Sequence, residues 1–175
     1  MTVVESRLRG NDLGEMTPNE RTARHIALVL PAALLAGAWA SQLIGGLYPC
    51  EMCHWQRWPH YGAVAAAALA FVVGGVSITR MLVAVAAVLI AVSGLIGVFH
   101  AGVEYHWWPG VTACSTTIAG AGLSTEEVLD RILAAPVVRC DAAQWRLLGV
   151  SLAGWNAILS LGGAGAIVRL LGRRR

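Results

Sequence analysis

Residues 47–59 of the chain read LYPCEMCHWQRWP and place two cysteines, Cys50 and Cys53, between two long apolar runs. Two thiols at this spacing can close a small disulfide ring with modest strain, so the dithiol and disulfide forms interconvert readily. The residues after Cys53 favour a helix, and a sulfur near a helix N-terminus is stabilised as a thiolate by the amide dipoles. Arg57 follows one helical turn later and would add a positive charge on the same face. This stretch therefore predicts a redox-active cysteine beside a fixed cation.

The composition around this motif is typical of a membrane protein. Hydrophobic residues make up 57% of the 175 residues and charged residues 13%, whereas a soluble domain carries about 25% charged residues. All of the basic residues are arginines, and the net charge of +3 is too small to indicate a nucleic-acid partner. We therefore expect an integral membrane protein that is surrounded by lipid and binds no nucleic acid.

Four apolar runs are long enough to cross about 30 Å of hydrocarbon, and we expect membrane spans at residues 26–47, 61–79, 81–99 and 147–171. Only Arg80 separates the second run from the third, which requires an antiparallel pair. The last run is rich in glycine and alanine, which allow close packing of helices in lipid. The first run also resembles a cleaved signal peptide, but it continues past the small-residue site at residues 38–40. The sequence predicts an all-α, four-helix membrane bundle.

The arginines predict how this bundle is oriented, because cytoplasmic loops of membrane proteins carry an excess of basic residues. Nine arginines fall on one side of a four-span arrangement and four on the other. This bias predicts a cytoplasmic polar tail at residues 1–24 and a cytoplasmic basic tail at residues 172–175. The loops at residues 48–60 and 100–146 would then face the oxidising periplasm of a bacterial inner membrane, together with all four cysteines.

The longer loop contains a pattern of its own. Ser124 and Glu127 form a capping-box pattern, an apolar stripe follows as far as Leu133, and Pro136 ends it. We expect a short amphipathic helix here, which packs either on other residues of the loop or flat on the membrane surface.

The same loop carries a second pair of cysteines, Cys114 and Cys140. Four cysteines allow three pairings. We favour Cys50–Cys53, which is local, and Cys114–Cys140, which closes the loop. The second disulfide could be an inert staple, but two disulfides on the same face of the membrane can exchange through mixed disulfides.

Taken together, these features resemble the DsbB family of disulfide bond formation proteins. The resemblance covers residues 25–171 and includes the Pro-Cys-x-x-Cys-x-x-x-Arg motif between the first two spans and the second cysteine pair between the last two. It also includes the run from Cys140 through Trp145 to Leu148 and Gly149. The resemblance implies a membrane thiol:quinone oxidoreductase that re-oxidises a periplasmic DsbA-like thioredoxin-fold protein.

The resemblance also implies a role for each residue of the site. The partner would attack Cys114 and release Cys140, which would engage Cys50 and free Cys53. Cys53 would then reduce a membrane quinone, either ubiquinone or menaquinone, while Arg57 polarises a quinone oxygen. The resemblance leaves open whether His100 or His106 also contacts the quinone, since both are near the start of the long loop.

Other interpretations of these residues are weaker. Cys50, Cys53 and His54 match the attachment signature of a c-type haem, which would make the chain a membrane cytochrome, but the loop is short and the second cysteine pair stays unexplained. A structural zinc site built from four thiolates is disfavoured in an oxidising compartment. Arg57 could instead extend to lipid phosphates, and His54 and His60 could be interface residues.

Overall fold

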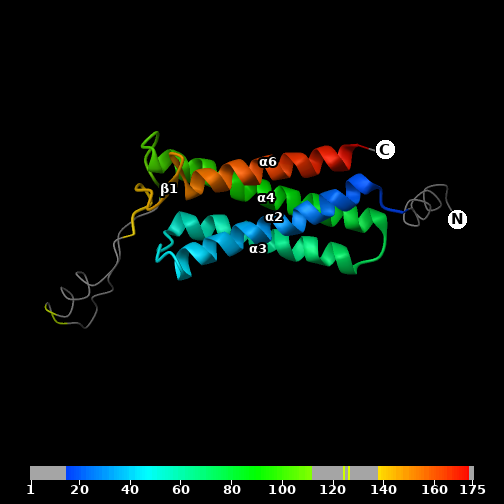
Figure 1. Ribbon diagram of the computed structural model, residues 1–175, viewed down its shortest axis with the longest axis horizontal. Helices are drawn as coiled ribbons and strands as arrows, with labels where there is room; N and C mark the ends of the chain where they lie inside the picture. Colours follow the sequence, from blue (N-terminus) through cyan, green and yellow to red (C-terminus); the bar gives the residue numbers. More distant parts are fainter. Residues whose placement is uncertain (1–14, 112–123, 125, 127–137, 174–175) are drawn as a thin grey trace.

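The computed structural model describes residues 15–111, 124, 126 and 138–173, and four long helices dominate it (Figure 1). These helices are α2 (Pro18–Leu43), α3 (Glu51–Val72), α4 (Val76–Glu104) and α6 (Leu152–Gly172). A short antiparallel hairpin of β1 (Arg146–Leu147) and β2 (Val150–Ser151) precedes α6. The prediction of a mainly helical protein is confirmed, and the hairpin is an addition that the sequence did not predict.

Within the described part of the chain, three helices are long and apolar enough to cross a membrane, namely α2, α4 and α6. The remaining long helix, α3, carries Gln56, Arg57 and His60 in its first half. These findings support a multi-pass membrane protein. The crossing of the membrane by α3 and the cytoplasmic location of the termini remain predictions.

The helices lie side by side (Figure 1) and pack through small residues. Alanines from all four long helices form much of the core, including Ala27, Ala67, Ala87 and Ala164. A Cβ atom added to Gly97 of α4 would lie 3.0 Å from the carbonyl oxygen of Ala153 in α6. The backbones of α4 and α6 therefore approach closely, as expected for helices that pack through small residues in lipid.

The chain turns between α3 and α4 earlier than the sequence pattern suggested. We predicted a break at Arg80, but α3 ends at Val72, and α4 is already helical at Arg80. Gly75 occupies the N-cap of α4 with φ of 98°, a conformation that is easy only for glycine. The conformational freedom of glycine, and not the charge of arginine, therefore decides where this hairpin of helices bends.

Helix α2 begins before the start of the predicted first span and ends before the end of that span. Thr17 accepts a hydrogen bond from the backbone N–H of Glu20, and the Glu20 carboxylate accepts one from the backbone N–H of Thr17. This capping box, with Pro18 in the first turn, starts the helix eight residues ahead of the apolar run that begins at residue 26. The helix ends at Leu43 rather than residue 47.

Two further boundaries differ from the predicted ones. Helix α3 begins at Glu51, so most of the predicted loop at residues 48–60 is helical. The last helix begins at Leu152 and not at residue 147, because Leu148 and Gly149 adopt positive φ angles of 53° and 79° and turn the chain back as a hairpin. Most of the predicted amphipathic helix at residues 124–133 lies outside the described residues, as does Cys114.

The two ends of the bundle differ in the residues that they carry (Figure 1). At one end the start of α2 meets the end of α6, where Asn19 donates a hydrogen bond to the carbonyl of Arg173. Arg80 forms an ion pair of 3.3 Å with Glu20 at the same end. Cys50 and the hairpin lie at the opposite end, so Arg80 and Arg173 are separated from Cys50 by the length of the bundle.

Candidate functional site

The cysteines of the first pair occupy defined positions at the start of α3. Cys50 is the N-cap, and its sulfur accepts a hydrogen bond from the backbone N–H of Cys53 at 3.4 Å. The two sulfurs are 3.1 Å apart, with the Cys50 thiol donating to Cys53. Both side chains are thiols in this structure, and they are close enough to form a disulfide after a small rotation. Helix α3 therefore positions both sulfurs through its own first turn.

The hydrogen bond between the thiols makes the pair chemically asymmetric. It raises the pKa of Cys50, with burial adding to the effect. The same bond lowers the pKa of Cys53, and a smaller contribution comes from the positive charge of Arg57. Cys53 lies on the first turn of α3, ahead of the apolar part of the helix. Of the two sulfurs, Cys53 is therefore the one that the site stabilises as a thiolate.

Arg57 points into the protein and is only 8% exposed. Its two terminal nitrogens donate to the Gln42 side chain at 2.9 Å and to the carbonyl of Ala38 at 3.0 Å, both on α2. The guanidinium also lies 5.3 Å from the ring centre of Trp39. These contacts do not fit an arginine that extends to lipid phosphates, and they fix the charge beside the cysteines.

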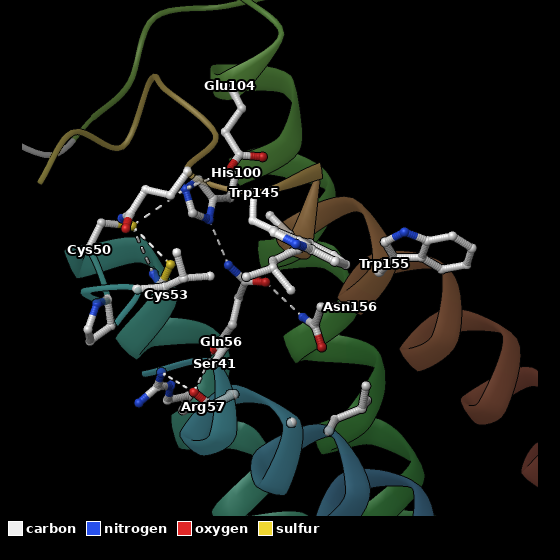
Figure 2. A pocket seen from close by; sticks show the side chains of 18 of the residues that line it. Ser41, Cys50, Cys53, Gln56, Arg57, His100, Glu104, Trp145, Trp155 and Asn156 are labelled. Carbon is white, nitrogen blue, oxygen red and sulfur yellow. Dashed lines mark hydrogen bonds and ion pairs between the residues drawn. The ribbon is translucent and has the colours of Figure 1, made fainter. Parts of the chain in front are cut away.

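A cavity of about 340 Å³ adjoins the cysteine pair (Figure 2). Helices α2 and α6 supply two of its walls, and residues 47–50, α3, the end of α4 and residues 139–147 supply the remainder. Apolar side chains such as Leu34, Leu159 and Trp155 share the lining with polar ones. The polar side chains of the lining are Ser41, Tyr48, Cys50, Cys53, Gln56, Arg57, His60, His100, Glu104, Arg139, Gln144 and Asn156.

The structure distinguishes the two histidines that the sequence left open. His100 is buried within α4, lines the cavity, and places Nε2 3.5 Å from the sulfur of Cys50. His106 follows the end of α4, is exposed, and is not part of the cavity wall. The placement of His100 in the long loop was wrong, because α4 extends to Glu104.

Cys140 is buried in the same cluster as the first cysteine pair. It packs with Cys50, Met52 and Val103, and its backbone forms a hydrogen bond with His100. The second cysteine pair therefore has one member beside Cys50, while the position of Cys114 lies outside the described residues.

Several polar residues of the site were missed in the sequence. Gln56, Ser93, Glu104 and Asn156 lie in helices with long apolar stretches, and a polar residue in such a helix is a candidate functional residue by default. That criterion could have found them. His60 is buried and bonded to Asn156 and Ser93, so its interpretation as an interface residue was wrong.

The sequence of the chain is similar to a known protein family. The family model described as "Disulfide bond formation protein DsbB" matches residues 20–170, which is most of the chain. The chain belongs to the DsbB family. DsbB-family membership makes it a membrane oxidoreductase that generates disulfides, consistent with the cysteine pair at the start of α3.

One curated protein resembles this DsbB-family chain. It is described as the uncharacterized protein RP370 of Rickettsia prowazekii (strain Madrid E), and it is 20% identical over 137 residues, or 78% of each chain. No solved structure matches the chain.

The site also bears on the two alternative functions. The sulfurs of Cys50 and Cys53 and a ring nitrogen of His100 lie within 4.8 Å of one another, so a metal ion is possible on distance alone. His54, which a c-type haem would need as its axial ligand, is exposed and does not line the cavity. Membership of the DsbB family favours redox chemistry of the cysteines over both alternatives.

Proposed function

We propose that the protein is a thiol:quinone oxidoreductase of the bacterial inner membrane, which re-oxidises a DsbA-like thioredoxin-fold protein in the periplasm. In the net reaction, a partner dithiol and a quinone become a partner disulfide and a quinol. The observation that carries the proposal is that Cys50, Cys53 and Arg57 line one cavity of a DsbB-family protein, while Cys140 packs in the buried cluster of Cys50.

The proposed orientation in the membrane is supported by the basic residues at one end of the bundle. Arg80 lies beside Glu20 and donates to the carbonyl of Leu171, so basic residues gather where α2 begins and α6 ends. Basic residues favour the cytoplasmic side. The opposite end, with the cysteines, would then face the periplasm, where disulfides persist.

Electrons would enter through the second cysteine pair. A thiolate of the partner attacks Cys114 in the Cys114–Cys140 disulfide and releases Cys140. Cys140 then attacks the sulfur of Cys50 in the Cys50–Cys53 disulfide and forms a mixed disulfide. The leaving group is Cys53, and exchange is faster when the leaving thiol has a lower pKa. The packing of Cys140 against Cys50 and the lowered pKa of Cys53 both support this order.

The cavity has the character that a quinone head group requires. It combines apolar walls from α2 and α6 with the guanidinium of Arg57 and the imidazole of His100, and such mixed linings suit small cofactors. A quinone bound there would supply the oxidising power by taking up two electrons and two protons. Arg57 would hold a carbonyl oxygen and stabilise negative charge that develops on it, because its own position is fixed by α2.

The test is a turnover assay with the purified full-length chain in detergent. A reduced DsbA-like protein is added together with ubiquinone or menaquinone, and quinone reduction is followed by absorbance. We expect quinone reduction that depends on both the protein and the dithiol. Absence of turnover with either quinone, in protein whose helical content is intact, would contradict the proposal.

A further inference from the structure

A chain of hydrogen bonds lies behind the cysteine pair and joins three helices (Figure 2). It runs from Asn156 of α6 to Gln56 of α3 and from there to His100 of α4, and the sulfur of Cys50 lies at its end. Gln56 and His100 are buried. Buried amides and imidazoles must satisfy specific donors and acceptors, so the chain has a direction that can be worked out.

The orientation of the Gln56 amide is fixed by a backbone group. Its nitrogen is 3.2 Å from the carbonyl oxygen of Met52, and a carbonyl can only accept a hydrogen bond. The NH₂ group of Gln56 therefore lies on this side. The same nitrogen is 2.8 Å from Nδ1 of His100, so Gln56 donates to that ring nitrogen.

The contacts of Asn156 independently require the same orientation of the Gln56 amide. Its nitrogen is 3.2 Å from the carbonyl oxygen of Ser93, which again can only accept. Its oxygen is 3.0 Å from a ring nitrogen of His60. The NH₂ group of Asn156 is thus left facing the side-chain oxygen of Gln56 at 2.8 Å. Two backbone carbonyls, on α3 and α4, therefore set both amides in one consistent arrangement.

The arrangement fixes the tautomer of His100. Because Nδ1 accepts from Gln56, the neutral ring carries its proton on Nε2. Nε2 is 3.5 Å from the sulfur of Cys50 and 3.8 Å from the Glu104 carboxylate. The backbone of Cys140, which also hydrogen-bonds the ring of His100, is a further acceptor beside it. We propose that Gln56 and Asn156 are positioning residues that hold His100 in the Nε2–H tautomer, so that it presents a hydrogen-bond donor to Cys50.

This tautomer has two chemical consequences. A donor beside the sulfur of Cys50 stabilises the negative charge that spreads over the sulfurs during thiol–disulfide exchange. A protonated Nε2 also has no lone pair directed at the sulfurs, so Cys50, Cys53 and His100 do not form a three-ligand metal site in this arrangement. The contribution to turnover rests on the proposed function, whereas the tautomer and the reactivity of Cys50 do not.

The first experiment measures the tautomer directly by nitrogen NMR of the full-length chain labelled at histidine, in detergent or lipid. The resonances of His100 are assigned by their loss in His100→Gln. We expect Nδ1 to have the shift of an unprotonated nitrogen and Nε2 that of a protonated one. A proton on Nδ1 in the unmodified protein overturns the proposal, and the variant His100→Gln serves only to assign the resonances.

The second experiment reverses the direction of the hydrogen bond between residue 56 and Nδ1 of His100. In Gln56→Glu the carboxylate can only accept from Nδ1, so we expect the His100 resonances to show a protonated Nδ1. Asn19→Asp makes the same change of amide to acid at the far end of the bundle and should leave the His100 spectrum unchanged. An unchanged His100 spectrum in folded Gln56→Glu would overturn the proposal.

The third experiment tests the reactivity of Cys50 without quinone or protein partner. Reduction of the Cys50–Cys53 disulfide by dithiothreitol should slow by about tenfold in Gln56→Glu and in Gln56→Met, the loss expected for one hydrogen bond to a charged group. Equal rates in Gln56→Met and the unmodified protein would overturn the proposal. If the unmodified chain shows the expected tautomer and rates but reduces no quinone, the proposed function fails and the positioning role stands.

Discussion

At the end of the bundle that carries the first cysteine pair, Gln56, Arg57 and His100 are buried and bonded to neighbouring helices. At the opposite end, Arg80 is partly exposed and contacts Glu20 and the last turn of α6. Both ends therefore hold positive charge, and at the cysteine end the buried Arg57 lines a cavity. The comparison teaches that burial and fixed partners, rather than charge alone, distinguish a candidate site from a cap on helix ends.

The largest expected effect comes from removing the sulfur that the site stabilises. Cys53→Ser should abolish oxidation of the partner protein, because no thiolate would be available to pass electrons on. The turnover assay measures this, and full turnover in Cys53→Ser would refute the relay.

A variant of the second cysteine pair separates the two halves of that relay. Cys114→Ser should block oxidation of the partner protein, yet the Cys50–Cys53 pair should still be oxidised by added quinone. Thiol counting by alkylation and mass spectrometry after quinone addition checks this outcome. Failure of quinone to oxidise the first pair in this variant would show that the two pairs are not sequential.

Replacing one arginine at each end sharpens the comparison. Arg57→Ala should lower kcat/KM for quinone by roughly tenfold or more, the effect expected for losing a charged hydrogen-bond donor. Arg80→Ala should leave quinone kinetics unchanged, but it removes the ion-pair partner of the buried Glu20 and should cost about 1–3 kcal/mol of stability. Equal kinetic losses in the two variants would mean that the cavity confers no special role on Arg57.

The hydrogen bond between the two thiols predicts a pH dependence. Because the pKa of Cys53 is lowered mainly by Cys50, alkylation of Cys53 should begin at lower pH than for an ordinary cysteine. In Cys50→Ala the midpoint should move to higher pH, which alkylation rates measured by mass spectrometry can show. A folded pKa below the unfolded one also means that the thiolate stabilises the reduced protein above the unfolded pKa, and that this contribution is lost as the pH falls through the folded value. An unshifted midpoint in Cys50→Ala would contradict the asymmetry of the pair.

The smallest expected effect concerns the arginine-rich end. Thr17→Ala removes the capping box of α2 and should cost about 1 kcal/mol of stability, measured by thermal unfolding in detergent. Turnover should not change, since Thr17 is the N-cap of α2, and α2 begins at the end of the bundle away from the start of α3, where Cys50 is the N-cap (Figure 1). A loss of turnover larger than the loss of folded protein would link the two ends.

The features of the site that depend only on residues close in the sequence were predicted correctly. The helix after Cys53 and the position of Arg57 one turn later follow from local spacing, and the structure shows both. The turn at Gly75 was missed because the arginine was given more weight than the glycine, although glycine was the better criterion.

Other features of the site depend on contacts between distant segments. Gln56 and Asn156 are separated by 100 residues, and no local pattern indicates that they meet. The choice of His100 over His106 likewise required the length of α4, because a shift of six residues moves a side chain from the buried helix to the exposed turn beyond it. The functional roles of these residues stay predictions that the experiments above can test.

Two walls of the cavity come from opposite ends of the chain, since α2 is the earliest of the described helices and α6 is the last. During synthesis on the ribosome, the cysteine pair therefore enters the membrane long before the helix that completes its surroundings. A nascent chain that lacks α6 would carry the thiols without the enclosed chamber and without Asn156. The order of insertion would thus leave the cavity beside the thiols incomplete, and Gln56 without its partner on α6, until α6 has been made.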